Sequence, residues 1–361
     1  MTSKHIAELR LHNQLIAKSK HKHPASVVRW LGAVQGQDYL GSLWGIGLRL
    51  PHGTETGVER AIADKKILRT WPMRGTLHLV ATEDARWMLK FLTPRVIARC
   101  ATLYRQSELD DKIFLKSKKL FIGALQGGKQ LTRQEMYDVL ERAKISTAGQ
   151  RGLHILGHLA MKGLLCFGAR KGKQQTFTLL DEWVPQSKDL EREEALSELA
   201  MRYFTSHGPA TLEDFTWWSG LSPTDARISL EMIKGQLVQE MVNDTKYWLV
   251  RNILTSKHNS SGAYLLPAYD EYTVAYKDRS VVLDPAHATL AKNGIFNPVL
   301  ILNGKVRGTW KRTLKKDQVV IDVAAFDELS KSNTHIVKEA AASYSQFMEM
   351  PVEISHSNHV V

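Results

Sequence analysis

The sequence predicts an α+β fold, with three small units that each run from helices into a two-stranded hairpin, followed by a mixed β domain. Three times along the chain, apolar residues at helical spacing give way to two short β-forming runs around a turn. Past about residue 258, short β-like runs dominate. Helices followed by a two-stranded wing are typical of tandem winged helices, whose second helix enters the DNA major groove. The predicted domains are 1–125, 126–186, 187–257 and 258–361.

In the first unit, apolar residues recur every three or four positions before two runs of alternating pattern. The predicted helices cover 4–17, 25–35 and 56–64, the strands 67–71 and 76–80, and a further helix opens at Thr82. In the second unit, Thr132 and Glu135 have the spacing of a capping box. Helices to about Ala143 and over 150–162 are expected there, then strands over 164–168 and 176–180.

The third unit begins with a predicted helix over 190–206, which Gly208-Pro209 ends. Thr211 and Ser222 are expected to cap two further helices, the second with proline at its first position. Asn243-Asp244 is a good hairpin turn between strands 238–242 and 247–250. In the C-terminal domain, 258–262 is an expected linker and Asn303-Gly304 a hairpin turn. Strands are predicted over 263–266, 298–302, 305–310 and 319–323, and a helix over 333–348.

The chain is basic, with 49 Lys and Arg against 37 Asp and Glu and a net charge of +12. That excess favours a polyanionic partner, although it fits a basic enzyme without nucleic acid equally well. Only Cys100 and Cys166 are present, so no disulfide framework is inferred. There is neither an N-terminal apolar segment typical of a signal peptide nor an apolar run of the ~20 residues that a membrane span needs. We therefore expect a cytoplasmic monomer that does not bind a membrane.

Two neutral amides stand one residue apart in Val34-Gln35-Gly36-Gln37-Asp38. On a regular helix, side chains at i and i+2 point about 200° apart, so Gln35 and Gln37 could not face one site. Gly36 favours a break in the helix, because glycine readily takes non-helical angles. If Gln35 ends the helix and Gln37 begins a loop, the two amides can converge. The alternative is that both glutamines are solvated or cap the backbone.

Three further segments offer polar side chains for a site. In the strand that follows Met73, alternation places Arg74, Thr76 and His78 on one face. There they could contact phosphate, a base or water. The alternative is a structural strand in which Arg74 pairs with Asp38 or Asp84. Tyr269-Asp270-Glu271-Tyr272 offers adjacent carboxylates, of which one could stabilise a sugar cation or orient water. Their alternative is pairing with Lys277 or Arg279.

The connection 169–174 carries Arg170, Lys171 and Lys173, which predicts either a phosphate-contacting wing or a solvated hairpin tip. Arg227 is a further candidate, on the second helix of the third unit. Trp217 and Trp218 are expected in the core and at its rim, the alternative being platforms on which bases stack. His154 and His158 have a zinc-compatible spacing, but no third ligand is apparent, and no glycine-rich phosphate loop is present, so neither metal nor cofactor is expected.

Segments spread over nearly the whole chain resemble the winged-helix DNA-binding family that contains the AlkZ-like DNA glycosylases. They are residues 33–38, 73–80, 266–272, 276–279 and 304–310. The resemblance implies three winged helices forming a basic cradle for duplex DNA, with a Gln-x-Gln motif on the concave side. It also implies excision of alkylated or cross-linked N7-substituted purines. In this chain the motif falls on Gln35 and Gln37, and its centre is Gly36 in place of a larger apolar residue.

The chemistry implied by this resemblance suits neutral amides. An N7-alkylated purine is cationic and already a good leaving group, so a positioned water and stabilisation of the developing sugar cation suffice. We therefore expect a monofunctional DNA glycosylase in which Gln35 and Gln37 act on water and sugar. Arg74, Thr76, His78, Arg170, Lys171, Lys173 and Arg227 would contact DNA, and Asp38, Asp270 and Glu271 would support the site. The alternatives are a non-catalytic regulatory or architectural DNA-binding protein, and a protein-interaction scaffold.

Overall fold

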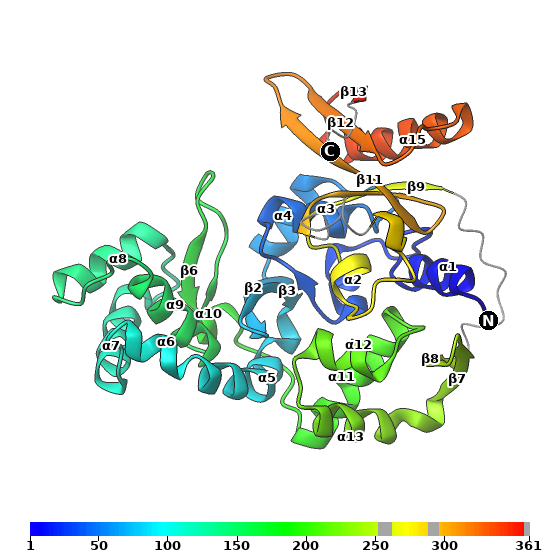
Figure 1. Ribbon diagram of the computed structural model, residues 1–361. Coiled ribbons are helices and arrows are strands. Elements are labelled where there is room, and N and C mark those ends of the chain that lie inside the picture. The colour runs from blue at the N-terminus through cyan, green and yellow to red at the C-terminus, as the bar shows by residue number, and fades with distance from the viewer. Residues whose placement is uncertain (252–261, 288–295, 357–361) are drawn as a thin grey trace. The chain divides into compact units, whose positions relative to one another are not determined.

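The computed structural model describes residues 1–251, 262–287 and 296–356, and it confirms a mixed α+β fold (Figure 1). The described chain forms two compact units. The discontinuous unit combines Met1–Val58 with Leu196–Val361, and the inserted unit is Glu59–Ala195. Helices α4 (Glu55–Ala63) and α11 (Arg192–Ser206) cross the two boundaries between them. No helix in the described part of the chain is long and apolar enough to cross a bilayer.

The inserted unit opens with the antiparallel hairpin of β2 (Ile67–Met73) and β3 (Thr76–Ala81), as predicted. Arg74 and Gly75 both have positive φ in its turn. Four helices and a short 3-10 helix cover the next stretch. They are η1 (Thr82–Asp84), α5 (Ala85–Arg99), α6 (Ala101–Gln106), α7 (Asp111–Leu125) and α8 (Arg133–Arg142). Thr132 and Glu135 form the predicted capping box at the start of α8.

The rest of the inserted unit is a helix and a small sheet. The elements are β4 (Leu131–Thr132), α9 (Arg151–Met161), β5 (Leu165–Phe167), β6 (Thr176–Leu179) and α10 (Leu180–Trp183). The strand order is β4-β6-β5, with both pairings antiparallel. Apolar faces of the helices and strands share one core, in which Phe121, Met136 and Leu156 are completely buried.

The N-terminal part of the discontinuous unit contains α1 (Ser3–Asn13), α2 (Pro24–Leu31), β1 (Val34–Gln35) and α3 (Tyr39–Gly47). The predicted helix over 25–35 was too long, because α2 ends at Leu31. Gly32, the residue that follows, has φ +79°, which L side chains rarely adopt and which stops the helical ladder. The chain from Gly32 to Asp38 is therefore not helical, and the motif glutamines lie beyond the helix end.

The second segment of this unit begins with α11 and continues with a helix pair and a hairpin. These are α12 (Leu212–Ser219), α13 (Pro223–Ile233), η2 (Lys234–Gln236), β7 (Leu237–Val242) and β8 (Thr245–Val250). Thr211 and Ser222 cap the two helices as predicted. Asn243 and Asp244 both have positive φ, as the predicted two-residue turn requires.

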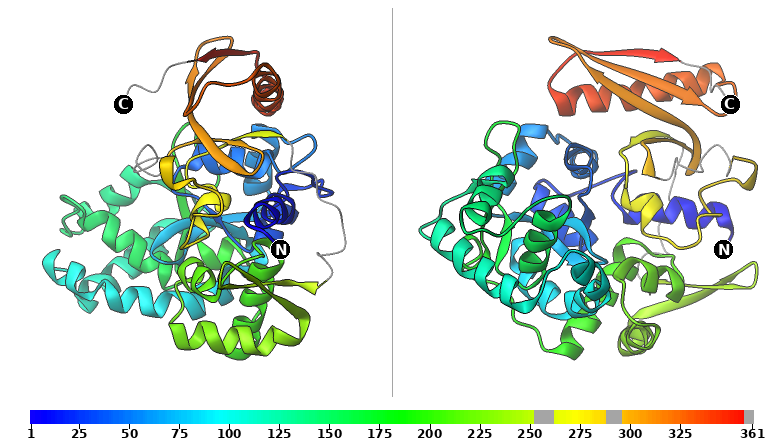
Figure 2. Two further views of the ribbon diagram at one scale, coloured as in Figure 1. Left: turned by 45° about the vertical axis from the view of Figure 1, so that its right-hand side comes forward. Right: turned by 60° about the vertical axis from the view of Figure 1, so that its left-hand side comes forward.

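The C-terminal part of this unit is a five-stranded sheet with the order β13-β12-β11-β10-β9. Its elements are β9 (Ala263–Leu266), α14 (Glu271–Val274), η4 (Pro285–His287), β10 (Val299–Leu302), β11 (Lys305–Leu314), β12 (Val319–Ala325), α15 (Lys331–Met348) and β13 (Val352–His356). Only β12 and β13 pair in parallel, and α15 joins them and lies alongside the sheet (Figure 2). Residues 258–261 of the expected linker lie outside the described residues.

Candidate active site

Gln35 is the last residue of β1, and Gly36, Gln37 and Asp38 lead from it to α3. The side chain of Gln35 is 9% exposed, whereas Gln37 is exposed to solvent. Oε1 of Gln35 accepts a hydrogen bond from the backbone N–H of Gln37 at 3.1 Å. Gln35 therefore caps the backbone of its own loop, which is one of the two arrangements expected for the motif. Asp38 ends the segment as the N-cap of α3, where its carboxylate accepts from Gly41 N–H at 3.1 Å.

Glu271 anchors this segment from α14, more than two hundred residues further along the chain. Its Oε1 accepts the backbone N–H of Gln35 at 2.8 Å, and its Oε2 accepts the indole N–H of Trp218 at 3.0 Å. Nε2 of His207 lies 3.5 Å from the same Oε2. All three side chains are buried, with Glu271 only 1% exposed. The carboxylate of Glu271 is thus an acceptor for two structural elements and is not open to solvent.

His207 is held as a neutral ring beside Glu271. Burial lowers the pKa of the imidazole, an effect that outweighs the nearby carboxylate of Glu271. Its ring stacks on Tyr203, with centroids 4.9 Å apart, and Nδ1 lies 2.8 Å from the hydroxyl of Ser206. The Ser206 hydroxyl donates to the Arg202 carbonyl at 2.7 Å, so a neutral ring with its proton on Nδ1 would donate to Ser206 and leave the lone pair of Nε2 on the side of Glu271.

Asp270 pairs with Arg49 and not with the residues that the sequence suggested. Its two carboxylate oxygens accept from the two terminal nitrogens of Arg49, each at 2.8 Å. Asp270 also caps α14 by accepting from Tyr272 N–H at 2.9 Å. The predicted pairing with Lys277 or Arg279 was wrong, because the two adjacent carboxylates diverge, Asp270 toward Arg49 and Glu271 toward Gln35 and Trp218. Nε of Arg279 instead donates to the carbonyl of Thr273 at 2.9 Å.

A second set of buried contacts supports this cluster from α1 and α12. The hydroxyl of Tyr276 donates to the His207 carbonyl at 2.8 Å, and the guanidinium of Arg10 lies 3.6 Å from the Tyr276 ring centroid. Arg10 also pairs with Asp214 at 3.6 Å. Gln14 connects the two sets, since its amide donates to Tyr276 and its carbonyls accept from Arg49. The loop that carries the glutamines is thus supported by a network of buried hydrogen bonds and ion pairs.

In the inserted unit, Arg74 and His78 come together, although Arg74 lies in the turn before β3 and not on the strand as predicted. Nη2 of Arg74 lies 3.2 Å from Nε2 of His78, and Nδ1 of His78 lies 3.0 Å from the carbonyl oxygen of Thr76. His78 is completely buried, while Arg74 and Thr76 are half-buried. His78 therefore orients the Arg74 side chain at the hairpin turn and does not face solvent itself.

The basic connection 169–174 forms the turn between β5 and β6, with Gly172 at φ +61°. Nη1 of Arg170 pairs with Glu59 at 2.6 Å, and Nζ of Lys171 lies 3.4 Å from Glu135. Lys173 is exposed. Arg227 is exposed on α13. The structure thus leaves the lysines of this turn at the surface and gives Arg170 a carboxylate partner.

The remaining aromatic and histidine candidates have structural surroundings. Trp218 is buried, whereas Trp217 is 46% exposed and donates to the Val274 carbonyl. His158 stacks on Phe114, with centroids 3.7 Å apart, and His154 contacts Ser107. Among the described residues, no group of three or more His, Cys, Asp or Glu side chains is arranged to hold a metal ion.

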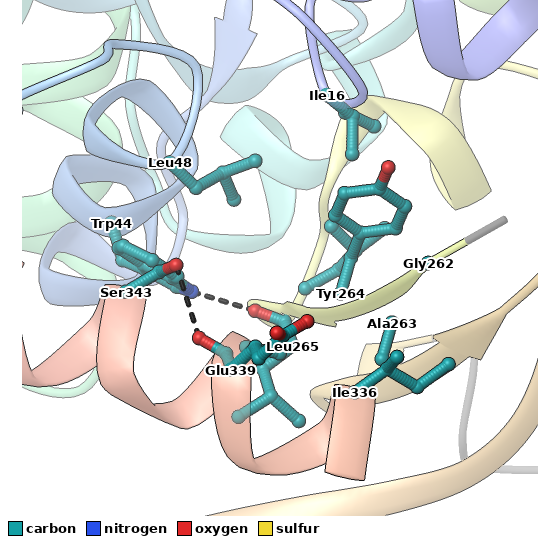
Figure 3. Close-up of a pocket in the computed structure, with 12 residues that line it drawn as sticks. Ile16, Trp44, Leu48, Gly262, Ala263, Tyr264, Leu265, Ile336, Glu339 and Ser343 are labelled. Atoms are coloured by element: carbon teal, nitrogen blue, oxygen red, sulfur yellow. Dashed lines mark hydrogen bonds between the residues drawn. The ribbon is translucent and has the colours of Figure 1, made fainter. Parts of the chain in front are cut away.

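A separate cavity of about 260 Å³ lies between α3, β9 and α15 (Figure 3). Trp44 donates its indole N–H to the Leu265 carbonyl at 2.7 Å across this cavity, and Tyr264 and Glu339 also line it. None of its lining residues contacts Gln35 or Glu271 in the hydrogen bonds described above, so this cavity is separate from the motif. The candidate active site is the Gln35–Gln37 loop, which carries the motif glutamines.

Three residues of the cluster were missed from the sequence as parts of the site: Arg49, His207 and Trp218. Arg49 did leave a signal, because it is the one charged residue in the apolar stretch 40–50. A lone cation in such a run predicts a buried partner. His207 carries no comparable signal, and Trp218 was expected in the core, where it lies.

Comparisons with known proteins agree over nearly the whole chain. A family model described as "DNA glycosylase AlkZ-like" matches residues 28–347. The "Interstrand DNA cross-link repair glycosylase" of Streptomyces sahachiroi is 28% identical over 369 residues, spanning 96% of this chain and 97% of that protein. The solved structure of Streptomyces sahachiroi DNA glycosylase AlkZ has the same fold, with a TM-score of 0.80 and 23% identity. That likeness covers 98% of this chain and 99% of the solved one.

Proposed function

The chain belongs to the AlkZ-like DNA glycosylase family, and from this premise we propose that it excises N7-substituted purines, including those that cross-link the two strands of DNA. The similar glycosylase of Streptomyces sahachiroi is named for interstrand cross-link repair, which supports this substrate class. The observation that carries the proposal is the exposed Gln37 amide on a loop that Gln35 and Glu271 hold in place.

The reaction is hydrolysis of the bond between the sugar C1′ and the base nitrogen. A substituent on N7 makes the purine cationic, so the bonding electron pair leaves with the base and neutralises it. The sugar gains cationic character as the bond breaks, and the oxygen of a water molecule then bonds to C1′ and releases a proton to solvent. A carboxamide oxygen can accept a hydrogen bond from this water and direct its negative dipole end toward the sugar. No charged nucleophile is required for so labile a bond.

The two motif glutamines would have different roles in the reaction. Gln37, being exposed, would contact water and the sugar. Gln35 has its carbonyl engaged with the Gln37 backbone, so its part would be to shape the loop and to offer its amide nitrogen toward the lesion. Asp38 would fix the far end of the loop as the cap of α3.

Duplex DNA would be held by tandem winged helices. Two arrangements of elements support this proposal. One is the sheet β4-β6-β5 with the helices α8 and α9, and the other is the run from α11 to β8, in which Ala210 bridges to Trp248. The first predicted winged helix, within residues 1–125, has a similar order of helices and strands along the chain, from α2 through β3. Under this proposal α9 and α13 are recognition helices, and a monomer binds the duplex.

Six residues would contact the DNA backbone or lesion: Arg74, Thr76, Arg170, Lys171, Lys173 and Arg227. His78 would act through Arg74, which it orients. Arg170 and Lys171 would exchange their carboxylate partners, Glu59 and Glu135, for phosphates. Such an exchange retains a charge-assisted hydrogen bond for each cation.

A base-release assay tests the proposal. Duplexes would carry N7-methylguanine or a nitrogen-mustard cross-link, and release would be measured in single turnover with excess protein. We expect Gln37→Ala to lower the rate about 100-fold, the scale of losing a transition-state hydrogen bond. Gln236→Ala, at an exposed glutamine outside the loop, is the control and should match the wild type. Equal rates for all three proteins would refute the role of the motif, and no release by the wild type would refute the substrate class.

A further inference from the structure

We propose that Glu271 is a positioning residue that sets the place of the Gln37 amide by holding the backbone of Gln35. The inference rests on the proposed function of the motif glutamines. It assigns to a buried carboxylate a task distinct from the direct sugar stabilisation that the sequence had suggested. Glu271 would affect the rate of the chemical step while touching neither DNA nor water.

The Glu271 carboxylate is buried away from solvent and substrate. The Glu271 side chain is 1% exposed, so a sugar or an attacking water cannot reach it without local unfolding. Each oxygen already accepts a hydrogen bond, from Gln35 N–H at 2.8 Å and from Trp218 Nε1–H at 3.0 Å. A carboxylate in this state is costly to leave without donors and is well placed to fix those donors in space.

Hydrogen bonds connect Glu271 with the segment that carries the exposed amide of Gln37. Glu271 fixes the Gln35 backbone, and Oε1 of Gln35 accepts from the backbone N–H of Gln37. Two consecutive hydrogen bonds thus connect a buried anion to the residue that would meet substrate. A displacement of the Gln35 backbone would move the Gln37 side chain, and misplacement of a reacting group by about 1 Å can cost about 100-fold in rate.

A carboxylate is needed at position 271 because both of its oxygens accept hydrogen bonds. Glutamine at position 271 would have one oxygen and one NH₂ group in the same volume. The oxygen could accept from Gln35 or from Trp218, but the NH₂ group would then face the other N–H donor. Glu271→Gln therefore removes one of the two contacts with little change in size. The neutral ring of His207, on the same side as Trp218, offers the NH₂ group a partial partner and favours a folded variant.

A double-mutant cycle with Gln37 provides the test. Single-turnover base release and DNA affinity would be measured for wild type, Glu271→Gln, Gln37→Ala and the double variant. We expect Glu271→Gln to slow release about 10- to 100-fold, with DNA affinity within about threefold of wild type. In the Gln37→Ala background, the same change should have little further effect, because Glu271 acts through Gln37. Additive losses, or a loss confined to affinity, would overturn the inference.

Two additions separate positioning from general destabilisation. Glu182→Gln is the control for the change from carboxylate to amide, since the exposed Glu182 carboxylate also accepts two N–H groups, those of Gly127 and Gly128, away from the motif. It should leave release unchanged, and a loss equal to that of Glu271→Gln would overturn the inference. If Glu271→Gln does not fold, Glu271→Asp takes its place in the cycle with the same expectation, because it keeps the charge but is one methylene too short to reach both donors. An unchanged rate for Gln37→Ala alone would refute the proposed function, whereas a slow Gln37→Ala beside a fast Glu271→Gln would refute only the positioning role.

Discussion

The guanidinium of Arg49 and the carboxylate of Asp270 form a bidentate ion pair, in which both N–O distances are 2.8 Å and both side chains are 1% exposed. Arg49 follows α3 and Asp270 caps α14, so the pair joins the two segments that carry Gln37 and Glu271. Arg49 also donates to the carbonyls of Gly45 and Gln14. The geometry meets the condition under which a buried ion pair is tolerated, because further hydrogen bonds satisfy the remaining donors.

We expect Asp270→Asn to lower the free energy of unfolding by about 3–5 kcal/mol, because it leaves the Arg49 charge buried without a counter-charge. Urea unfolding at pH 7 measures this. Asp181→Asn is the control, since Asp181 pairs with Arg86 at 2.6 Å but is 78% exposed, and a loss below about 1 kcal/mol is expected there. Similar losses for the two variants would show that burial does not govern the strength of the Arg49 pair.

Local signals in the sequence predicted most of the fold. Capping residues are read from three or four neighbouring positions, and Thr132, Thr211 and Ser222 each cap the helix expected of them. Turn pairs are equally local, and Asn243-Asp244 and Asn303-Gly304 adopt the positive φ values that two-residue hairpins require. The end of α2 was misjudged because the apolar spacing continues to Val34, whereas the backbone conformation of Gly32 stops the helix at Leu31.

The site was less predictable because its contacts join distant parts of the chain. The motif glutamines and the adjacent carboxylates were identified as candidates, but nothing local shows that Glu271 bonds to Gln35, 236 residues away. Arg49 and Asp270 are 221 residues apart. The roles of Trp218 and His207 likewise depend on tertiary packing around Glu271, which no spacing of residues encodes.

The lysines of the turn between β5 and β6 are expected to contribute to the salt dependence of DNA binding. Lys171 and Lys173 are both exposed, and each phosphate contact contributes about 0.9 to the slope of log affinity against log salt concentration. Lys171→Ala/Lys173→Ala should therefore reduce the slope by about 2. Fluorescence anisotropy with an undamaged duplex, between low and moderate salt, would measure it.

The matched control for these lysines is Lys331→Ala/Lys338→Ala, which makes the same change of net charge on the exposed side of α15. It should leave the slope within about 0.5 of wild type. An equal reduction by both pairs would mean that net charge alone, and not a contact made by the β5–β6 turn, sets the salt dependence.

His158 should make the protein less stable as the pH falls. Burial lowers the pKa of its imidazole to about 4, with a further lowering from Lys162 and an opposing effect from Asp111. In the unfolded chain the histidine titrates near 6.5, so below that pH the unfolded state binds a proton that the folded state does not. The contribution of this group to the free energy of unfolding is therefore fully present above about pH 6.5 and falls until about pH 4, by up to about 3 kcal/mol.

His158→Phe should remove this loss, because phenylalanine can keep the stacking on Phe114 and carries no titratable group. Urea unfolding at several pH values between 4 and 7 should show that the free energy of unfolding of His158→Phe rises relative to that of the wild type as the pH falls. His335→Phe, at a histidine that is 75% exposed, is the control, and its curve should run parallel to that of the wild type. Parallel curves for His158→Phe and wild type would contradict a neutral, buried His158.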